Sequence, residues 1–565
     1  MEERIRKAVG EALTQAGAPD VSFTVERPND VAHGDYTTNA ALVASKTLGK
    51  KSHEIADEIA RFLIDALGKD IASHVAVAGP GFVNITLARE AVSFAVAEAD
   101  AKGEEWGKGS EDSGKPHSAK APRGERVIIE YTDPNPFKEM HIGHLMSNTI
   151  GEAISRLIGN EGAAVIRACY SGDIGPHVAK AIWGLRKGGI TEPTTANELS
   201  SAYVAGNRAY EDLPEAKEEI DALNQALYAG TDSALMEEWR IGRAVALDAF
   251  EKIYKILGTK FDYYFFESET SESGLRIVHD GIKQGVFEES EGAIIYRGET
   301  RGLHTLVFIT SKGTPTYEAK ELGLAFLKEE RVQSDRSIIV TATEQIGHFK
   351  VVLAALSEIA PLIEKKTAHV PHGFLRLTSG KMSSREGKVI TAAGFIEDII
   401  TEASEKNPDP LIAEQVAIGA IKYMVLRQAP GSDIIFDPEK SLSLEGDSGP
   451  YLQYALVRAK SVLAQVAGKG SSSTIIYDSA RKSPYVIERI ILHFPEVTAR
   501  AARELAPNLL STYLTELAGE WNSFYAAERI VGGDHEAYKL MLARAFVNTM
   551  TNGLSLLGIP APEKM

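Results

Sequence analysis

The sequence predicts an α/β protein built around a doubly wound parallel sheet, with an α+β unit before the sheet and an all-α bundle after it. Three observations support this prediction. A strand, a loop, a helix and a second strand follow one another between residues 125 and 170, residues 1–98 mix helical with β-rich segments, and apolar residues recur at helical spacing from about residue 408. The order of strand, helix and strand is how a Rossmann-like parallel sheet begins.

Length and composition are those of an ordinary globular protein. The 565 residues are too many for one core, so about two to four domains are expected. The hydrophobic share of 44% and the charged share of 25% are average for soluble proteins. No apolar run approaches the roughly 18 residues of a membrane span, and residues 1–4 open an acid-containing helix without the apolar segment of a secretory signal. We therefore expect a soluble protein of the cytoplasm that does not contact membranes.

Charge and cysteine content restrict the chemistry. The single cysteine, Cys169, cannot form an intramolecular disulfide or a cysteine-based zinc cluster, so we expect no zinc or other metal held by protein side chains. Cys169 lies within an apolar strand and is expected in the core. The net charge of −17 argues against a surface that is basic all over. Nucleic acid is still compatible with local basic patches, and an acidic remainder weakens non-specific phosphate binding.

Residues 1–98 are expected to form the α+β unit. Helical periodicity predicts helices at 5–16 and 53–67, and β-rich segments are predicted at 21–26 and 74–87. Residues 99–124, above all from Ala101 on, are dominated by Gly, Ser, Lys, Glu and Pro. That composition predicts a flexible linker and a domain boundary.

Residues 125–407 are expected to form the sheet and its helices, and residues 408–565 the helical bundle. Strands are predicted at 125–131, 162–170, 337–343 and 373–377. A helix that ends at a glycine is predicted at 143–159. A polar, helical insertion is expected at about 191–290, most clearly up to Gly258.

A histidine motif follows directly after the first strand. Residues 133–144 contain His141-Ile142-Gly143-His144, with the helix beginning near its end. A helix N-terminus offers free N–H donors and a positive dipole to a phosphate chain. Gly143 would let an adenine ring approach the backbone, and His141 and His144 would direct imidazole donors at phosphates. The alternative is that both histidines cap the helix or fill the core.

A second motif lies far downstream, within residues 379–388. Lys381-Met382-Ser383-Ser384-Arg385 is followed by a further lysine, Lys388, and has glycines on both sides. Such a loop can fold over a triphosphate and offset charge that builds at the α-phosphate. Alone, it would more often be a solvated surface turn, but after a histidine motif in a parallel sheet the phosphate role is favoured.

The two motifs together closely resemble the paired signatures of class I aminoacyl-tRNA synthetases. Residues 130–137, which approach the histidine motif, and residues 313–321 resemble the arginyl enzymes. Residues 33–39 with 79–84 resemble their N-terminal tRNA-binding domain. Three C-terminal segments resemble their helical anticodon-binding domain: 447–454, 521–525 and 552–554. Cysteinyl synthetases share a helical C-terminal domain, but they resemble a zinc-dependent group that needs cysteine ligands.

The resemblance implies an activity and its partners. ATP would activate L-arginine to arginyl-adenylate, and the arginyl group would pass to tRNA(Arg), with Mg²⁺ accompanying ATP and no zinc. No enzyme nucleophile is needed, so the protein supplies positioning and charge stabilisation. We expect a monomer. Two rivals remain: a paralogue that binds tRNA without catalysis, and a different small-molecule nucleotidyl transferase.

Residue by residue, the resemblance assigns the ATP site. His141, His144 and Lys381 would contact phosphates, and Gly143 the adenine. The family's second loop lysine is replaced here by Ser384, so its charge would come from Arg385, Lys388 or Lys138. The catalytic candidates are therefore His141, His144, Lys381, Lys138 and Arg385.

The resemblance also assigns the arginine and tRNA contacts. A guanidinium is a planar fork of donors that a carboxylate binds bidentately. The guanidinium would be surrounded by Tyr317, Glu321 and Gln345. The amino-acid backbone would be contacted by Glu130 and Asn135. The commoner family residue at Glu321 is aspartate. Asn84 matches a position that contacts the tRNA D-loop, and Asp173 and His177 are candidates to line the site because they follow a strand end.

Overall fold

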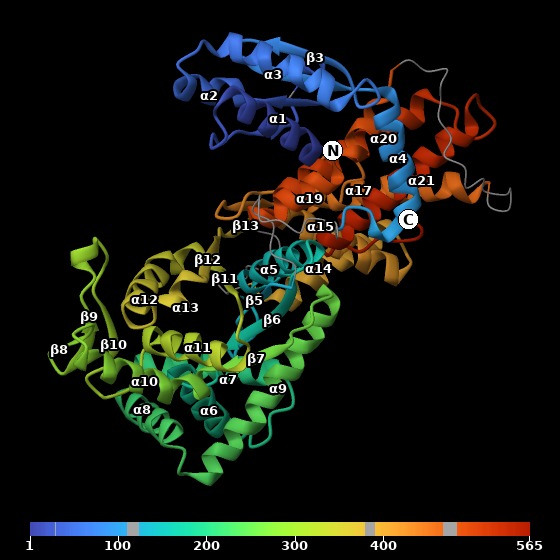
Figure 1. Cartoon of the computed structure of the whole chain (residues 1–565). Helices are drawn as coiled ribbons and strands as arrows, with labels where there is room; N and C mark the ends of the chain where they lie inside the picture. The colour runs from blue at the N-terminus through green and yellow to red at the C-terminus, as the bar shows by residue number, and fades with distance from the viewer. Residues whose placement is uncertain (29, 110–123, 379–389, 467–482) are drawn as a thin grey trace.

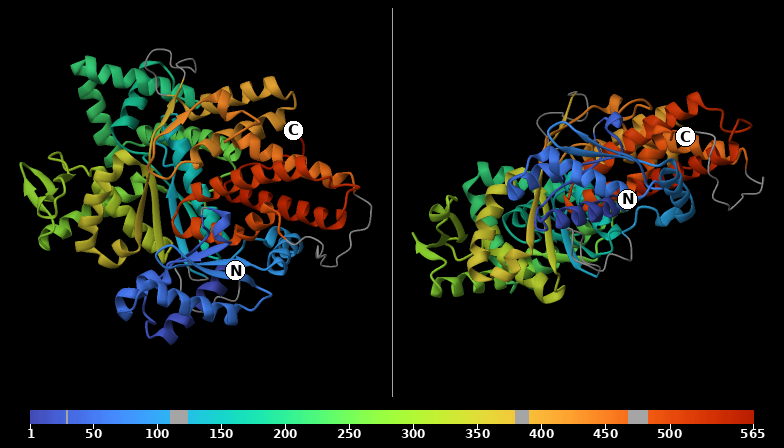
Figure 2. Two further views of the ribbon diagram at one scale, coloured as in Figure 1. Left: turned by 90° about the horizontal axis from the view of Figure 1, so that it is seen from above. Right: turned by 45° about the horizontal axis from the view of Figure 1, so that its top comes forward.

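The computed structural model describes residues 1–28, 30–109, 124–378, 390–466 and 483–565. It has three parts (Figure 1): an N-terminal α+β unit, a central parallel sheet covered by helices, and a C-terminal helical bundle. The N-terminal unit lies beside the bundle in the turned views as well (Figure 2). The predicted fold class is confirmed.

The central sheet has five parallel strands in the order β12-β11-β5-β6-β7. Their bounds are Arg126–Tyr131 (β5), Ala164–Ser171 (β6), Tyr263–Phe266 (β7), Arg336–Ala342 (β11) and Thr367–His372 (β12). The chain order reverses between β5 and β11, which makes the carboxyl ends of these two strands the topological switch point. In such sheets ligands bind at that point.

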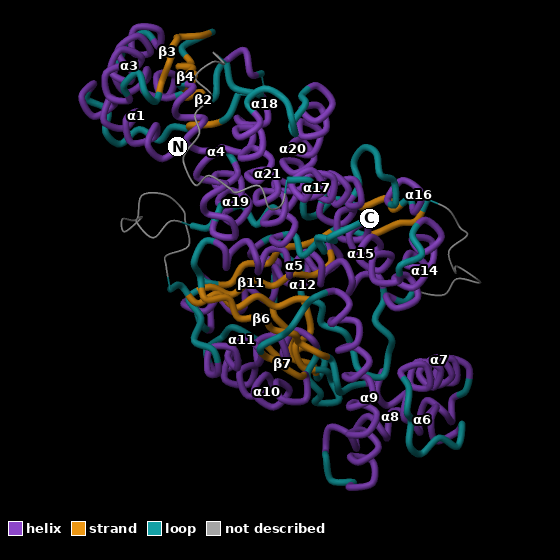
Figure 3. Tube along the Cα trace, turned by 90° about the vertical axis from the view of Figure 1, so that its right-hand side faces the viewer, coloured by secondary structure: helices purple, strands orange, loops and turns teal. Residues whose placement is uncertain are grey.

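Helices cover both faces of this sheet (Figure 3). Helix α5 (Ile142–Asn160) packs on the face of Val127 and Ile129, and α11 (Tyr317–Arg331) packs on the face of Ile128. Because successive side chains of a strand point to opposite faces, one uninterrupted apolar run can bury both. The predicted strand at 125–131 and helix at 143–159 are therefore confirmed to within a few residues.

The last strand of the central sheet differs from the prediction at 373–377. Leu375–Leu377 does form a strand, β13, but it pairs with β14 (Ile434–Phe436) in a separate two-stranded sheet. The fifth strand of the central sheet is β12, which pairs in parallel with β11. Its sequence, Thr-Ala-His-Val-Pro-His, has two histidines and a proline and so lacks a strand's apolar pattern.

The segment between β6 and β11 begins with helices, as expected from residue 191. They are α6 (Pro176–Lys187), α7 (Ala196–Asp212), α8 (Pro214–Ala229), α9 (Ser233–Leu257) and, after β7, α10 (Glu267–Lys283). The edge strand β7 thus returns to the sheet inside the range 191–290. An antiparallel three-stranded sheet follows: β8 (Glu288–Ser290), β9 (Ala293–Tyr296) and β10 (Leu306–Ile309). Between β11 and β12 lie η4 (Thr343–Gln345), α12 (Ile346–Ile359) and α13 (Pro361–Lys365).

The N-terminal unit packs helices on one face of an antiparallel sheet with the order β1-β2-β4-β3. Its elements are α1 (Glu2–Ala16), β1 (Val25–Glu26), β2 (Tyr36–Thr38), α2 (Ala40–Leu48), α3 (Ser52–Leu67), β3 (Ala72–Ala78) and β4 (Phe82–Leu87). Helix α4 (Arg89–Lys102) follows and runs through the expected boundary at residue 98. The exact boundary stays a prediction.

The C-terminal part is a bundle of helices. Helix α14 (Ala392–Lys406) lies before the expected start of the bundle at residue 408. The helices after it are α15 (Pro410–Leu426), α16 (Pro438–Ser441), α17 (Gly449–Ala464), α18 (Val486–Leu492), α19 (Phe494–Arg503), α20 (Pro507–Ala527) and α21 (Glu536–Leu556). In the parts of the chain that the structure describes, none of the helices has the length and apolar character needed to cross a membrane. Cys169 is buried in the core, as expected.

Candidate active site

The loop after β5 has an unusual backbone. Thr132, Asp133 and Phe137 all have positive φ, at 82°, 50° and 67°. Side chains make this conformation costly, so surrounding contacts must maintain it. The Thr132 N–H donates to Ser147 Oγ at 3.0 Å, and the Tyr170 N–H donates to Asp133 Oδ1 at 2.7 Å. The loop is thereby fixed at the switch point, where the predicted histidine motif follows it.

His141 and His144 cap the N-terminus of α5. His141 Nδ1 accepts the Gly143 N–H at 3.1 Å, and His144 Nδ1 accepts the His141 N–H at 3.1 Å. The two rings stack with centroids 3.8 Å apart. Burial lowers the pKa of both imidazoles, and for His144 the neighbouring His141 lowers it further. Both rings are therefore neutral near pH 7, and since Nδ1 accepts, each carries its proton on Nε2.

The capping role and the phosphate role predicted from sequence are thus compatible. Capping uses one nitrogen of each ring and leaves an Nε2–H donor on the other side. Gly143 has a local reason of its own, because a Cβ there would lie 2.9 Å from His141 Nδ1. Any larger residue would push the His141 ring out of the cap. Its proposed adenine contact stays a prediction.

Lys138 lies close to the histidines. Its positive charge lowers the pKa of His141, His144 and His177, after the larger effect of burial in each case. The Lys138 ammonium sits over the ring of Tyr203 in α7, 4.3 Å from the ring centroid. A cation–π contact restrains the lysine without neutralising it. Sequence reasoning selected Lys138 but contained no signal for Tyr203.

Glu130 is buried at the end of β5 and forms an ion pair with the buried Lys328 of α11. Lys328 was not predicted from the sequence. It stands seven residues after Glu321 and so lies on the same face of α11. Burial, and then the charge of Glu130, raise the pKa of Asp133 well above its usual range. The Lys328 ammonium pairs with Glu130, and its positive charge also lowers the pKa of Asp133 and Glu321, against the larger effect of burial.

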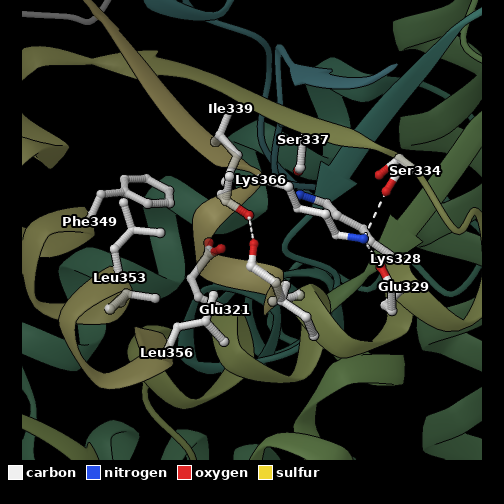
Figure 4. Close-up of a pocket in the computed structure, with 14 residues that line it drawn as sticks. Glu321, Lys328, Glu329, Ser334, Ser337, Ile339, Phe349, Leu353, Leu356 and Lys366 are labelled. Carbon is white, nitrogen blue, oxygen red and sulfur yellow. Dashed lines mark hydrogen bonds and ion pairs between the residues drawn. The ribbon is translucent and has the colours of Figure 1, made fainter. Parts of the chain in front are cut away.

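Glu321 lines a narrow pocket between α11, β11 and α12 (Figure 4). Phe349, Leu353 and Leu356 lie on one side of its carboxylate, and Lys328 and Lys366 lie on the other. Burial, and then the negative charge of Glu130, raise the pKa of Glu321 to about 8. The structure thus brings Glu321, Glu130 and Lys328 into one electrostatic group.

The other three predicted arginine contacts, Tyr317, Gln345 and Asn135, do not line this pocket. Tyr317, at the first turn of α11, is 58% exposed. Gln345 is half-buried and directly precedes α12. Asn135 lies against the end of β6, where a Cβ on Gly172 would come within 2.2 Å of its Oδ1. Their substrate roles stay predictions.

A buried pair next to Asn135 was missed from the sequence. Lys320 Nζ lies 2.5 Å from Glu267 Oε2, and both side chains are almost fully buried. A Cβ on Gly172 would also come within 3.0 Å of Glu267 Oε1. The ammonium of Lys320 stands 5.5 Å from the ring centroids of Tyr317 and Tyr228. This pair holds the start of α11 against α10.

Asp173 and His177 act as anchors in the structure. The Asp173 carboxylate accepts the backbone N–H of Ser268 at 2.9 Å and its hydroxyl at 2.8 Å, and it pairs with Arg243 at 3.3 Å. His177 Nε2 bonds the Gly172 carbonyl at 2.7 Å, and burial lowers its pKa to about 3. Both side chains are buried. Asp173 therefore fixes the loop after β6 to the first turn of α10 and to the middle of α9, and His177 fixes the start of α6 to the same loop.

The remaining predicted residues lie elsewhere. Asn84 is on β4 of the N-terminal unit, where its Oδ1 accepts from the Thr37 hydroxyl at 2.8 Å. Lys381, Ser384, Arg385 and Lys388 lie outside the described residues. Within the described ranges, no group of three or more His, Cys, Asp or Glu side chains is arranged to hold a metal ion.

Three family models match successive parts of the chain. The family described as "tRNA synthetases class I (R), catalytic domain" matches residues 112–438. The "Arginyl tRNA synthetase N terminal domain" matches residues 2–87, and the "DALR anticodon binding domain" matches residues 452–565.

Whole-chain relatives agree with these matches. An "Arginine--tRNA ligase" of Lactococcus lactis is 30% identical over 99% of this chain and 100% of its own length. One from Treponema denticola is 30% identical over 96% of this chain and 95% of its own length. The solved arginyl-tRNA synthetase of Thermus thermophilus superposes with a TM-score of 0.81 at 26% identity, covering 100% of both chains. A catalytic-domain match over more than half of the sequence, flanked by the two domains that accompany it, means that this chain belongs to the arginyl-tRNA synthetase family of class I tRNA synthetases.

Proposed function

We propose that the chain is an arginine–tRNA ligase that converts L-arginine and ATP to arginyl-adenylate and then transfers the arginyl group to tRNA(Arg). The observation that supports this most directly is the pair of stacked imidazoles at the N-terminus of α5. His141 and His144 are neutral, and each is left with an Nε2–H donor. They stand at the switch point of a parallel sheet, where a nucleotide is expected.

In the first step, a carboxylate oxygen of arginine attacks the α-phosphorus of ATP and pyrophosphate leaves. Negative charge shifts onto the phosphate oxygens, and donors fixed in advance stabilise it best. The two Nε2–H groups and the N-terminus of α5 supply such donors, and Lys138 adds positive charge close by. Lys381, with Arg385, would act from the second motif. Mg²⁺ would accompany the phosphates of ATP, which are oxygen ligands.

In the second step, a ribose hydroxyl of the terminal tRNA adenosine attacks the arginyl carbonyl and AMP leaves. No protein nucleophile takes part in either step, so the enzyme contributes positioning and electrostatics. Arginine would be held by Glu321 at the guanidinium, with Tyr317 and Gln345 beside it. Glu130 and Asn135 would hold the amino-acid backbone. An ionised carboxylate selects a guanidinium fork over the point charge of lysine.

The tRNA would be held by both flanking parts. Asn84 and the outer face of the N-terminal sheet would contact the tRNA elbow, and the C-terminal bundle would contact the anticodon. We also propose that the protein acts as a monomer in the cytoplasm.

Exchange of labelled pyrophosphate into ATP tests the activity. We expect exchange that depends on arginine, with tRNA included because this family resembles synthetases that need it for activation. Lysine and the other amino acids should support none above background. Binding of tRNA without arginine-dependent exchange would instead identify a non-catalytic paralogue, and exchange driven by another acid without tRNA would identify a different nucleotidyl transferase.

A further inference from the structure

The N-terminal unit is attached to the rest of the protein by a helix that is itself held in place. Helix α4 begins in the core of the N-terminal unit with Val92 and continues into the central core with Val96. Arg544 of α21 donates to both carboxylate oxygens of Asp100 at 2.8 and 2.7 Å. Asn548, also on α21, donates to the Ala99 carbonyl at 3.0 Å. Helix α4 therefore lies along α21, as Figure 3 shows.

Asp35 connects the N-terminal sheet to α18. Its Oδ2 accepts the Leu87 N–H at 2.7 Å, and its Oδ1 forms an ion pair with Arg489. The Asp35 side chain is 2% exposed. Gly34 before it has a φ of 94°, and a Cβ there would lie 2.7 Å from the Ile85 carbonyl oxygen. The His-Gly-Asp segment is thus shaped to bring this carboxylate to the bundle.

Tyr36 makes the second connection, to α19. Its hydroxyl donates to Glu496 at 2.7 Å, and the Glu2 N–H at the start of α1 donates to the same oxygen at 2.7 Å. His493 Nδ1 lies 2.9 Å from the other carboxylate oxygen. One carboxylate of the bundle therefore binds both the sheet and the first helix of the N-terminal unit.

Arg89 makes the third connection. Its guanidinium lies 3.2 Å from Glu488 of α18, and the two side chains are 6% and 0% exposed. The Tyr538 hydroxyl of α21 donates to the same Glu488 oxygen at 2.5 Å. These three pairs, Asp35–Arg489, Tyr36–Glu496 and Arg89–Glu488, are called the interdomain latch below.

Breaking a buried ion pair costs more than forming it gains, because one charge is left buried without its partner. Removal of two ionised groups from water costs about as much as their attraction returns, unless the distances and the remaining hydrogen bonds are right. Two of the three latch pairs join opposite charges, and the third joins a hydroxyl to a carboxylate. Any rotation of the N-terminal unit against the bundle would leave one of these buried groups unpaired. The latch therefore permits essentially one orientation.

In that orientation, Thr37 and Asn84 lie on the face of the N-terminal sheet that is opposite to the core residues Tyr36, Val83 and Ile85. Successive strand residues point to opposite faces, so Thr37 faces away from the side on which Tyr36 is buried. Thr37 pairs in register with Asn84, and Thr37 and Asn84 are both half-buried. The segment 33–39, expected from sequence to mark a tRNA contact, thus has one side for docking and one side for a ligand.

We propose that the interdomain latch makes the N-terminal sheet and the C-terminal bundle one preformed cradle for a single tRNA, with Asp35, Tyr36 and Arg89 as positioning residues rather than tRNA contacts. The proposal rests on the proposed function, since it takes tRNA as the ligand. Two surfaces held at a fixed separation bind one partner more tightly than two that move independently, because the second contact forms at a high effective concentration.

Arg489→Met tests the latch in the full-length chain. It keeps the aliphatic stem and removes the partner of Asp35. Arg27→Met is the matched control, since Arg27 pairs with Glu516 across the same interface at 2.5 and 2.8 Å, but the Arg27 side chain is only half-buried, at 31% exposed, and that of Glu516 is 42% exposed. At one fixed salt concentration, we expect at least about a tenfold loss of tRNA affinity for Arg489→Met. Arg27→Met should bind as the wild type does.

The distance between two spin labels, one on the N-terminal unit and one on the bundle, measures whether a variant changes their relative orientation. Cys169 is buried, so cysteines introduced at the exposed Ile64 of α3 and Arg503 of α19 can carry the only two spin labels. The distance distribution should be narrow in the wild type and in Arg27→Met, and broad in Arg489→Met. This measurement needs no tRNA, so it tests the latch even if the chain does not bind tRNA.

Two outcomes would overturn the proposal. One is a narrow, unchanged distribution in Arg489→Met. The other is a broad distribution with wild-type tRNA affinity, which would mean that fixed orientation does not matter to binding. If Arg489→Met does not fold, Asp35→Asn combined with Arg489→Met removes both charges and keeps an acceptor for Leu87 N–H, and the same two outcomes apply to it.

Discussion

The Nδ1 of His144 accepts the backbone N–H of His141 at 3.1 Å, so one nitrogen of the ring closes the first turn of α5 and the other is free to donate. In the proposed mechanism, this division gives one side chain a structural role through Nδ1 and a catalytic role through Nε2. The two functions can be removed one at a time with side chains that reproduce one nitrogen but not the other.

His144→Asn should keep the cap and lose the donor. The Asn amide oxygen can replace Nδ1, but nothing reaches the position of Nε2. We expect wild-type thermal stability and a fall of about 10²–10³ in the single-turnover rate of adenylate formation, as for loss of one transition-state donor. His144→Gln, which reaches further but caps poorly, should be less stable and more active than His144→Asn. Equal rates for His144→Asn and the wild type would remove His144 from the mechanism.

Arginine binding should depend on pH through Glu321. Its pKa is raised to about 8, so below pH 8 the carboxyl is protonated and must lose that proton before it pairs with a guanidinium. The arginine KM should therefore fall as pH rises from 6.5 to 8, by at most about tenfold per pH unit, and level off above.

Two variants identify the titrating group. Glu321→Gln should abolish the slope and raise the arginine KM far more than the ATP KM. Glu318→Gln alters a neighbouring acid that pairs with His348 at 3.3 Å and should leave the slope intact. A wild-type arginine KM that is flat between pH 6.5 and 8 would contradict this assignment.

The contribution of Lys138 to adenylate formation should depend on the ring of Tyr203, over which its ammonium lies. A cation–π contact is worth about 0.5–2 kcal/mol, so Tyr203→Leu should slow adenylate formation by roughly 2- to 30-fold, whereas Tyr203→Phe keeps the ring and should be near wild type. In a Lys138→Met background, the Leu and Phe variants should have the same rate. A Tyr203→Leu effect that persists without Lys138 would show that Tyr203 acts by another route.

Lys422 should make stability depend on pH. Its Nζ donates to the Leu257 and Gly558 carbonyls at 2.6 and 2.8 Å, and burial, then the charge of Arg156, lower its pKa to about 7. Between pH 7 and about 10 the unfolded chain holds a proton at Lys422 that the folded chain lacks. The contribution of Lys422 to stability therefore rises with pH across this window, by at most about 1.4 kcal/mol per pH unit.

Comparison of unfolding at pH 7.5 and pH 9 measures that contribution. The stability of the wild type relative to Lys422→Met should increase between the two values, by at most about 2 kcal/mol. Lys440→Met, at a lysine side chain that is 84% exposed, should show no such change. Parallel behaviour of the wild type and Lys422→Met would mean that Lys422 keeps its ordinary pKa in the fold.

What the sequence predicts well is local. The segment 127–131, apolar except at Glu130, predicts a strand buried on both faces, and the helix after His141 follows from spacing and a terminal glycine. Strand β12 was missed because its histidines and proline hide the pattern. Tertiary pairing to β11 decides its structure.

What the sequence does not predict is contact between distant residues. Lys328 is 198 positions from Glu130, and Asp35 is 454 positions from Arg489. No periodicity relates such pairs, because only the folded topology brings them together. The arginine contacts were therefore predicted as two acids, two amides and the Tyr317 ring, without Lys328, which pairs with Glu130. In the same way, the segment 33–39 was predicted as a tRNA contact, but the contacts of Asp35 and Tyr36 with the C-terminal bundle were not predicted.

Charging of tRNA is the measurement that decides whether the protein is an arginine–tRNA ligase. Purified protein, ATP, Mg²⁺ and labelled arginine would be incubated with tRNA(Arg) transcript, and acid-precipitable label would be followed to its plateau. We expect an arginyl ester on most of the tRNA(Arg), little on a tRNA for another amino acid, and no labelled product when labelled lysine replaces arginine. A plateau for tRNA(Arg) no higher than for the unrelated tRNA, from protein that is folded and binds ATP, would contradict it.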